Sequence, residues 1–536
     1  MALNKSTKGD VANTLAQGNV QIEVTTPWHP YPDKFWRISK AEYPGSGVDN
    51  DPYIVDFLDD DAANPQLWPS LYKWALTLFV SIATLAVGFC SSAYAGAAGG
   101  IMTFFGTSPE VTTLGISLFV LGFALGPLIW APLSEVAGRR PLLIYTYMAL
   151  TAFNVGTALA PNMAALIVLR FFSGAFGSSP LTNAGGIIAD MFTAEQRGLA
   201  MSLFAAAPFM GPVIGPIVGG FTGESIGWRW VMWLMAFFSG TILVLSTVLL
   251  PETYAPVLLR RRAAKLSKVN SKVYRSKYDG TVDIHLGQLL KASLIRPWAL
   301  LFREPIVMLL SIYMAIIYGI LYMLFAAFPL VFQRARGWSP GIGGLAFVGV
   351  AVGMIFAVIY TIIDNRRYVH ICHQHGGFAP PEARLPPAIV GSIAIPIGLF
   401  WFAFTNSPSI AWIVCEIATV PFGFGMVLLF LSCSNYLVDS YLIYAASVLA
   451  ANSVLRSIFG AVFPLFTTKM YDRLGIHWAS ALPAFLAVAC LPFPLLFWRY
   501  GADVRKRCKY TAEATQFLMQ RGAAVKKATP KAEDAA

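Results

Sequence analysis

The sequence predicts an all-α integral membrane protein with twelve transmembrane helices arranged as two six-helix bundles. Three observations lead to this fold class. The 536-residue chain has a mean hydropathy of +0.60 and only 12% charged residues, about half the charged fraction of an average globular domain. Its apolar residues gather in blocks of about twenty, the length that crosses a bilayer as a helix. The blocks are continuously apolar rather than alternating, which argues against a transmembrane β-barrel.

The apolar blocks form two sets of six, separated by a long basic loop. We expect a largely disordered cytoplasmic tail over residues 1–70, a six-helix bundle over 71–250, a cytoplasmic loop over 251–305, a second six-helix bundle over 306–500 and a cytoplasmic tail over 501–536. The expected helices are Trp74–Ala95, Leu114–Leu133, Leu142–Ala160, Met163–Ala189, Leu199–Phe221, Trp230–Leu250, Ile306–Phe332, Ile342–Ile363, Ala388–Phe404, Ile410–Leu431, Ala445–Phe466 and Ala479–Trp498.

Lysine and arginine gather in one set of connections. They crowd the central loop at Arg260–Lys277 and the final tail at Arg505–Lys509, whereas the connections between helices 1 and 2, 3 and 4, and 9 and 10 have none. Because basic residues stay on the cytoplasmic side, we expect both termini in the cytoplasm and the protein in the cell membrane, with the vacuolar membrane as the alternative. We interpret the net charge of +11 as topology and contact with anionic lipid, not as nucleic-acid binding.

The segment "GPVIGPIVGG" places glycines and prolines inside the fifth expected helix. Glycines four residues apart share one helical face and let a neighbouring backbone approach closely. The prolines weaken backbone hydrogen bonding and permit a bend. This pattern predicts a helix that bends or seals against a partner, as part of a gate. The residues concerned are Gly211, Pro212, Gly215, Pro216, Gly219 and Gly220.

This string resembles the antiporter signature in the fifth helix of drug:proton antiporters of the major facilitator superfamily. "APLSEVAGRRP" (Ala131–Pro141) resembles the superfamily's loop between helices 2 and 3, with Ala131, Glu135 and Val136 in place of glycine, aspartate and arginine. The resemblance implies a charge cluster that latches the cytoplasmic side shut, with a glycine for the tight turn. The residues of this expected cluster are Glu135, Gly138, Arg139 and Arg140.

Further stretches are similar to the fungal twelve-span branch of multidrug and polyamine-type exporters, and the resemblance covers roughly residues 55–510. It implies alternating access between two halves, with substrate moved outward against an inward proton flow. The stretches similar to this branch are Ala63–Trp74, Gly227–Trp233, Leu250–Ala263 and Tyr444–Phe466, while Leu166–Pro180 and Ala189–Ala200 resemble the superfamily's fourth-helix signature and its turn between helices 4 and 5.

Ionisable residues inside the expected helices are few: Arg170, Glu416 and Arg456 are the main ones. Such residues are costly in a bilayer and usually face a cavity or a partner. The resemblance implies a role for Arg170 in proton coupling. An arginine stays protonated, so Arg170 would act on a nearby carboxylate or a water, or else lock onto backbone carbonyls. Desolvation disfavours a charged carboxylate, so Glu416 suits a proton site, a counter-charge for a cationic substrate, or a structural pair. For Arg456 a coupling role and a structural role both stay open.

Aromatic residues recur along one face of the seventh expected helix, at Tyr318, Tyr322 and Phe325. Lining a central cavity, they would suit flat amphipathic ligands and would attract cationic ones through their ring faces. Plain packing between helices is the other interpretation.

These patterns predict a transporter and not an enzyme. The sequence shows no P-loop, dinucleotide fingerprint or metal-ligand spacing, so we expect no cofactor and no metal. The expected function is export of small amphipathic compounds, such as drugs, toxins or a fungal secondary metabolite, by proton antiport. A polyamine or other cationic-metabolite transporter of the same fold is the alternative. The expected partners are the substrate, the proton and membrane lipid, with the protein acting as a monomer.

Overall fold

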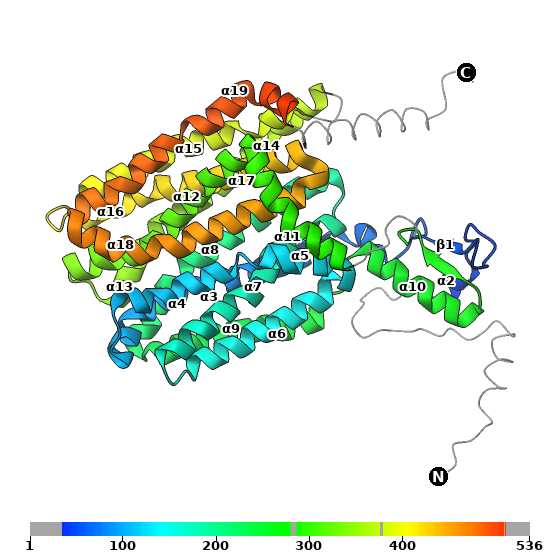
Figure 1. Ribbon diagram of the computed structural model, residues 1–536, viewed down its shortest axis with the longest axis horizontal. Helices are drawn as coiled ribbons and strands as arrows, with labels where there is room; N and C mark the ends of the chain where they lie inside the picture. The colour runs from blue at the N-terminus through cyan, green and yellow to red at the C-terminus, as the bar shows by residue number, and fades with distance from the viewer. Residues whose placement is uncertain (1–34, 280–285, 376–378, 509, 511–536) are drawn as a thin grey trace, which may run out of the picture.

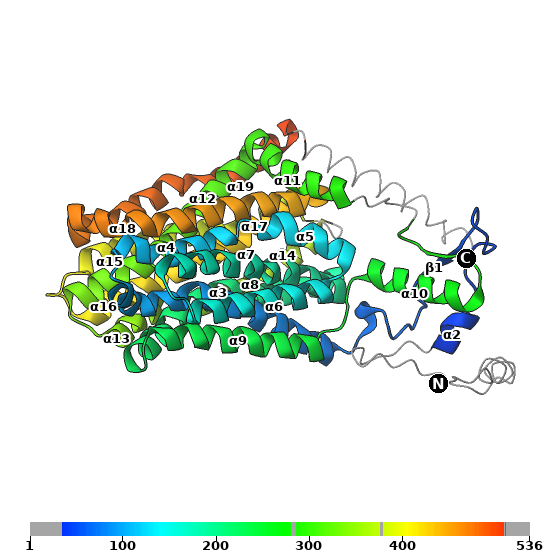
Figure 2. The same cartoon turned by 60° about the horizontal axis from the view of Figure 1, so that its bottom comes forward.

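The computed structural model describes residues 35–279, 286–375, 379–508 and 510. These residues form two bundles of long helices that lie side by side, and a small module projects beyond one end of them (Figure 1). We call this end of the bundles the module end, and the opposite end, where α13 and α16 lie (Figure 2), the far end. The prediction of an all-α fold built from two helical bundles is confirmed.

The amino-terminal bundle follows the order of its expected helices. Helix α4 starts at Pro109, and the Ser108 side chain accepts a hydrogen bond from the Val111 amide at 3.4 Å, as an N-cap does. Helix α7 starts after Asn162, whose side chain accepts from the Ala165 amide at 2.8 Å. The helices are α3 (Ser70–Phe105), α4 (Pro109–Gly122), α5 (Gly126–Ala137), α6 (Arg139–Ala158), α7 (Met163–Met191), α8 (Ala194–Ser225) and α9 (Trp228–Leu249).

The carboxyl-terminal bundle is built from longer and more interrupted runs. Helix α12 (Pro305–Phe328) continues into a π-helical turn, η2 (Pro329–Ala335). The remaining elements are α13 (Pro340–Gly344), η3 (Leu345–Phe347), α14 (Val348–Gln374), η4 (Pro381–Arg384), α15 (Pro386–Thr405), α16 (Trp412–Ile417), α17 (Thr419–Tyr441), η5 (Leu442–Tyr444), α18 (Ala445–Cys490) and α19 (Pro492–Arg507).

Ten helical runs among the described residues are long and apolar enough to cross a membrane. One of them, Ala445–Arg507, is 63 residues long and is interrupted at Gly475, whose φ of 73° and ψ of 169° are not helical. A positive φ costs glycine little, so this run comprises two arms. Helix α6 lies within the bundle beside α7 and α9. Counting both arms and α6 gives the twelve spans that the sequence predicts.

The projecting module joins the segment before α3 to the central loop. Strands β1 (Tyr53–Val55) and β2 (Tyr274–Ser276) pair in parallel, with Tyr53 opposite Tyr274. An apolar cluster forms behind them, and Asp61 makes a buried 2.5 Å ion pair with Arg262. The cluster consists of Ile38, Val55, Leu259, Ala263 and Leu266. The module's other elements are α2 (Phe35–Lys40), η1 (Pro65–Leu67) and α10 (Ala255–Asn270), and α11 (Leu286–Arg303) then leads to α12.

This module differs from the expected tail. Disorder was expected over most of residues 1–70, of which 1–34 lie outside the described residues. Segments between residues 35 and 61 pack against the central loop, and η1 packs against α7. The sequence does not reveal the packing because each segment is short and polar by itself. The apolar cluster exists only when the two segments meet, more than 180 residues apart along the chain.

Candidate functional site

Arg170 lies at the centre of the amino-terminal bundle and is completely buried. Its guanidinium donates hydrogen bonds to the carbonyls of Cys90 at 2.7 Å, Ser91 at 3.0 Å and Gly115 at 3.0 Å. It also lies 4.2 Å from the centre of the Phe119 ring. Arg170 therefore ties α7 to α3 and α4 through backbone oxygens. Among the described residues no carboxylate pairs with it, so its role in proton coupling stays a prediction.

A line of hydroxyl groups continues from Ser91 into the other bundle. The Ser91 Oγ lies 2.9 Å from the Tyr322 hydroxyl, and the Tyr318 hydroxyl lies 3.5 Å from that of Tyr322. Ser91 Oγ also donates to the Gly88 carbonyl at 2.6 Å, which uses its only proton. Tyr322 must therefore donate to Ser91, and Tyr318 donates to Tyr322. The line joins α12 of one bundle to α3 of the other.

Arg456, on α18, extends this chain of contacts. We call Arg170, Ser91, Tyr322, Tyr318 and Arg456 the central group. The Arg456 guanidinium carbon lies 4.8 Å from the ring centre of Tyr318 and 5.8 Å from that of Phe430. Its Nε is buried without a hydrogen-bond partner, and Arg456 forms no ion pair with the described residues. The structure thus brings Arg170, Tyr318 and Arg456 into one connected group, although they are far apart in the sequence.

The predicted aromatic face is closed in this conformation. Tyr318, Tyr322 and Phe325 are 5%, 0% and 2% exposed, and the rings of Tyr322 and Phe325 are 5.1 Å apart. Phe430 contacts Phe209 of the other bundle at 4.9 Å between ring centres. These rings therefore pack at the boundary between the two bundles, and their role as a substrate lining stays a prediction.

Glu416 lies away from the central group. It sits on the short helix α16 at the far end (Figure 2). Its Oε1 accepts a hydrogen bond from the Gly349 amide at 2.7 Å, at the start of α14. A carboxylate is favourable at a helix N-terminus. Its Oε2 is buried without a hydrogen-bond partner.

The expected charge cluster forms at the module end, with a different set of acids. Gly138 has φ +99° and separates α5 from α6. The Arg139 amide donates to Glu252 at 3.0 Å, and its side chain lies 3.5 Å from Asp190 and donates to the Ser134 hydroxyl. Glu135 makes no hydrogen bond or ion pair with the described residues.

Arg140 of this cluster donates a hydrogen bond to the Thr247 carbonyl at 3.0 Å. All these contacts join segments of the amino-terminal bundle and the residues just after it. Glu252 is the acid that sequence reasoning missed. It lies in a segment that resembles the family pattern, but nothing in its spacing shows that the chain returns to the start of α6.

The glycine face of α8 packs directly on α3. A Cβ on Gly211 would meet the Phe89 nitrogen at 2.9 Å, and one on Gly215 would meet the Ala93 nitrogen at 2.7 Å. Gly219 faces the Ala93 carbonyl. The helix runs without interruption from Ala194 to Ser225 through Pro208, Pro212 and Pro216.

The last glycine of the string faces the other bundle. A Cβ on Gly220 would lie 2.6 Å from the Pro340 carbonyl, and the Gly341 amide donates to Glu224 at 2.8 Å. The two bundles are therefore in backbone contact at the far end. The gating role of this string stays a prediction, and these contacts are where it would act.

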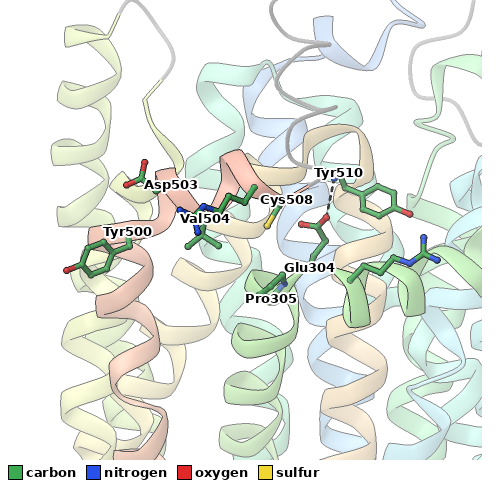
Figure 3. Close-up of a pocket in the computed structure, with 9 residues that line it drawn as sticks. Glu304, Pro305, Tyr500, Asp503, Val504, Cys508 and Tyr510 are labelled. Carbon is green, nitrogen blue, oxygen red and sulfur yellow. Dashed lines mark hydrogen bonds between the residues drawn. The ribbon is translucent and has the colours of Figure 1, made fainter.

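A separate cavity of about 670 Å³ lies at the module end of the second bundle (Figure 3). Glu304, 1% exposed, accepts hydrogen bonds there from the Tyr441 hydroxyl at 3.0 Å and the Tyr510 amide at 3.2 Å. Burial, together with the Glu304 carboxylate, raises the pKa of Cys508 to about 12, so this thiol stays protonated. The cavity contains no residue of the central group. Among the described residues no group of histidines, cysteines and acids could hold a metal ion.

A model of the Major Facilitator Superfamily matches residues 80–464 of the chain. The chain is 61% identical over 499 residues to a protein of Trichophyton rubrum described as "MFS-type efflux pump MFS2", covering 93% of this chain and 83% of that one. It is 62% identical over 496 residues to "Major facilitator superfamily multidrug transporter mdrA" of Aspergillus fumigatus, covering 92% of this chain and 81% of that one.

Solved structures share the fold at low sequence identity. The proton:xylose symporter XylE superposes with a TM-score of 0.57 at 18% identity, covering 81% of this chain and 96% of that one. The human organic anion transporter MFSD10 superposes with a TM-score of 0.52 at 16% identity, covering 80% of this chain and 100% of that one.

Proposed function

The chain belongs to the major facilitator superfamily, and from this premise we propose that it is an efflux pump that exports small amphipathic compounds across a membrane. The observation that carries the proposal is the similarity to two fungal proteins described as an efflux pump and a multidrug transporter, at 61% and 62% identity over more than nine tenths of the chain. Similarity at this level extends through the helices that hold the central group. It places the chain among transporters and not among enzymes.

The export cycle that we propose is alternating access between the two bundles. The central group lies at their boundary, where transporters built from two halves place their substrate. Opening toward the far end must break the contacts of Gly220 and Glu224 with the second bundle. Opening toward the module end must break an apolar contact with Ala450 and Val454 of α18, which is made by Leu128 of α5 and by Ala124 in the turn before α5.

We take the driving force to be an inward proton gradient. Arg170 cannot carry a proton, so it holds Ser91 and the hydroxyl line in place. Glu416 is the candidate proton acceptor, because one of its oxygens is buried without a partner and it lies at the far end, which we take to face outward. The module end carries the basic residues of α10 and α19, which supports a cytoplasmic location for both termini. We expect a monomer in the cell membrane, in contact with anionic lipid.

The test is accumulation of fluorescent dyes and azole antifungals in a pump-deficient yeast that expresses this chain. We expect lower accumulation than in cells without it, and loss of the difference on adding a protonophore. Glu416→Gln should also abolish the difference, whereas Glu382→Gln, an acid paired with Arg505 outside the central group, should leave most of it. Unchanged accumulation of every compound, with the protein present at the membrane, would contradict the proposal.

A further inference from the structure

We propose that the central group selects amphipathic acids: compounds that present a carboxylate, enolate or phenolate oxygen on a flat apolar body. The inference rests on the proposed function and names its substrate class. It rests on Arg456, which forms no ion pair with the described residues, and on the direction in which the Tyr318 and Tyr322 hydroxyls donate. Both offer hydrogen-bond donors to a ligand.

Arg456 is the first part of the argument. Its guanidinium lies over the faces of Tyr318 and Phe430, and its buried Nε has no partner. Arg170, by contrast, places its three nitrogens on three carbonyls. Arg456 as a whole is only partly buried, so the cost falls on its Nε, because a buried donor without an acceptor loses its hydrogen bond to water. Ring faces offset part of that cost, and a bound anion would offset more.

Among the residues that the structure describes, no carboxylate lies within ion-pair distance of Arg456. The acids of the spanning helices lie near helix ends, as Glu110, Asp190 and Glu416 do, or pair with a neighbouring arginine, as Asp364 pairs with Arg367. A polyamine or other cation would therefore enter a site that is already positive. This arrangement disfavours the cationic-metabolite alternative.

The hydroxyl line points the same way. Tyr318 donates to Tyr322, which donates to Ser91 of the other bundle. When the bundles separate, Tyr322 loses its acceptor while keeping its proton. An oxygen that only accepts can replace Ser91, whereas an ammonium group, which only donates, cannot. Arg456 and Tyr322 would thus both bind an oxygen that accepts hydrogen bonds.

The rest of the ligand is set by the neighbouring rings. Phe325, Phe430 and Phe209 provide apolar faces around the donors. Flat apolar bodies stack on such faces. A small hydrophilic acid would leave them uncovered, so the expected ligand is amphipathic.

The test uses fluorescein and a cationic rhodamine, which share the xanthene ring system and carry opposite charges. Binding of each dye to the purified full chain in lipid nanodiscs is measured by fluorescence anisotropy, at a pH where fluorescein is ionised. We expect fluorescein to bind at least tenfold more tightly than the rhodamine. Arg456→Met should remove most of that preference, and Arg456→Lys should keep part of it. Arg334→Met, which removes an arginine that is 69% exposed at an ion pair with Asp472, should leave it unchanged.

Equal binding of the two dyes, tighter binding of the rhodamine, or no binding of either would overturn the proposal. So would an unchanged fluorescein preference in a folded Arg456→Met variant, whose folding is checked by its melting temperature. The accumulation assay separates this failure from that of the proposed function. Azole export without a preference for acids would leave the efflux pump standing and refute only its selectivity.

Discussion

Arg170 forms hydrogen bonds with carbonyls on two helices other than its own, so one side chain fixes the relative position of α3, α4 and α7. Hydrogen bonds that involve a charged group each contribute about 1.5–3 kcal/mol to stability. Removal of this side chain also leaves a void in a completely buried place. The stability of the amino-terminal bundle should therefore depend strongly on this residue.

We expect Arg170→Met to lower the free energy of unfolding by about 3–5 kcal/mol, the range for loss of one partner from a buried charged contact. Arg170→Lys should fall between it and the unchanged protein, because an ammonium group cannot reach three carbonyls in the same fork geometry. Thermal unfolding in detergent, followed by size-exclusion chromatography, measures both. An Arg170→Met variant as stable as Arg334→Met would refute this role.

The hydroxyl contact between the bundles can be measured separately. Ser91→Ala and Tyr322→Phe each remove one side of the 2.9 Å contact, and a double-mutant cycle isolates its energy. We expect a coupling of about 1 kcal/mol in unfolding by denaturing detergent, which is typical of a neutral hydrogen bond. Additive effects of the two substitutions would show that the contact contributes nothing, and that the line from Ser91 to Tyr318 is not a functional unit.

The sequence identifies most of the central group by residue type but not by arrangement. Arg170, Arg456 and Tyr318 stand out because charge, or a repeated aromatic spacing, is unusual inside an apolar helix. Ser91 does not stand out, since serine is common in such helices and its importance comes only from the Tyr322 hydroxyl opposite. Glu416 also stands out as a charge inside an apolar segment, but it lies outside the central group, because its carboxylate binds the Gly349 amide at the start of α14.

At the scale of helices, the contact between α3 and α8 is made largely by backbone atoms. Gly215→Ala would place a Cβ against the Ser92 hydroxyl and 2.7 Å from the Ala93 nitrogen. We expect this single methyl group to abolish export and to lower the melting temperature, because neither helix can give way without moving the bundle. Gly99→Ala is the matched control, since a Cβ there has nothing within 4 Å. Alanine is favoured in helices by about 1 kcal/mol over glycine, so this control should be neutral or slightly stabilising. Equal losses in both variants would contradict the interpretation.

The module offers a second test at this scale. The Asp61–Arg262 ion pair has side chains that are 5% and 4% exposed, whereas the neighbouring Arg260–Asp279 pair has both at 29%. We expect Arg262→Met to open the module, because it removes the cationic partner of the buried Asp61 carboxylate. Cleavage of the central loop by trypsin should then be at least tenfold faster. Arg260→Met should change the rate little, since exposed pairs contribute about 0–1 kcal/mol. Similar cleavage rates in the two variants would argue against a structural role for the buried pair.

Helices were predictable because their signal is local. About twenty apolar residues in a row predict a membrane span wherever they occur, and the glycine string predicts close packing between helices. The broken run of α18 and the pairing of β1 with β2 depend on residues distant in sequence, so no local pattern reports them. Helix α6 was expected from its apolar block, although it is not among the ten runs that qualify by length and composition.

At the scale of the whole molecule, the proposed cycle requires the two bundles to move apart at the far end. Lys469 of α18 and Glu110 of α4 approach to 3.8 Å there. We expect a flexible bis-maleimide that joins Lys469→Cys and Glu110→Cys to stop export, in a background carrying Cys372→Ser. The same reagent on Lys506→Cys and Asp503→Cys, both on α19, should have no effect. Full export after cross-linking between the bundles would rule out motion at this end.

The backbone contact between α3 and α8 also bears on how such a pump could acquire new substrates. A surface of glycine and alanine has almost no rotamers to choose from, and it offers no side chain that can be exchanged for another of similar volume. Nearly every substitution adds volume, so few changes of sequence are tolerated at the contact between α3 and α8. Variation in what the pump exports would have to accumulate elsewhere, and the rings around Tyr318 and Arg456 are places where one side chain can replace another without parting two helices. A library randomised at those ring positions should yield many folded members with altered selectivity, while one randomised at Gly211, Gly215 and Gly219 should yield almost none.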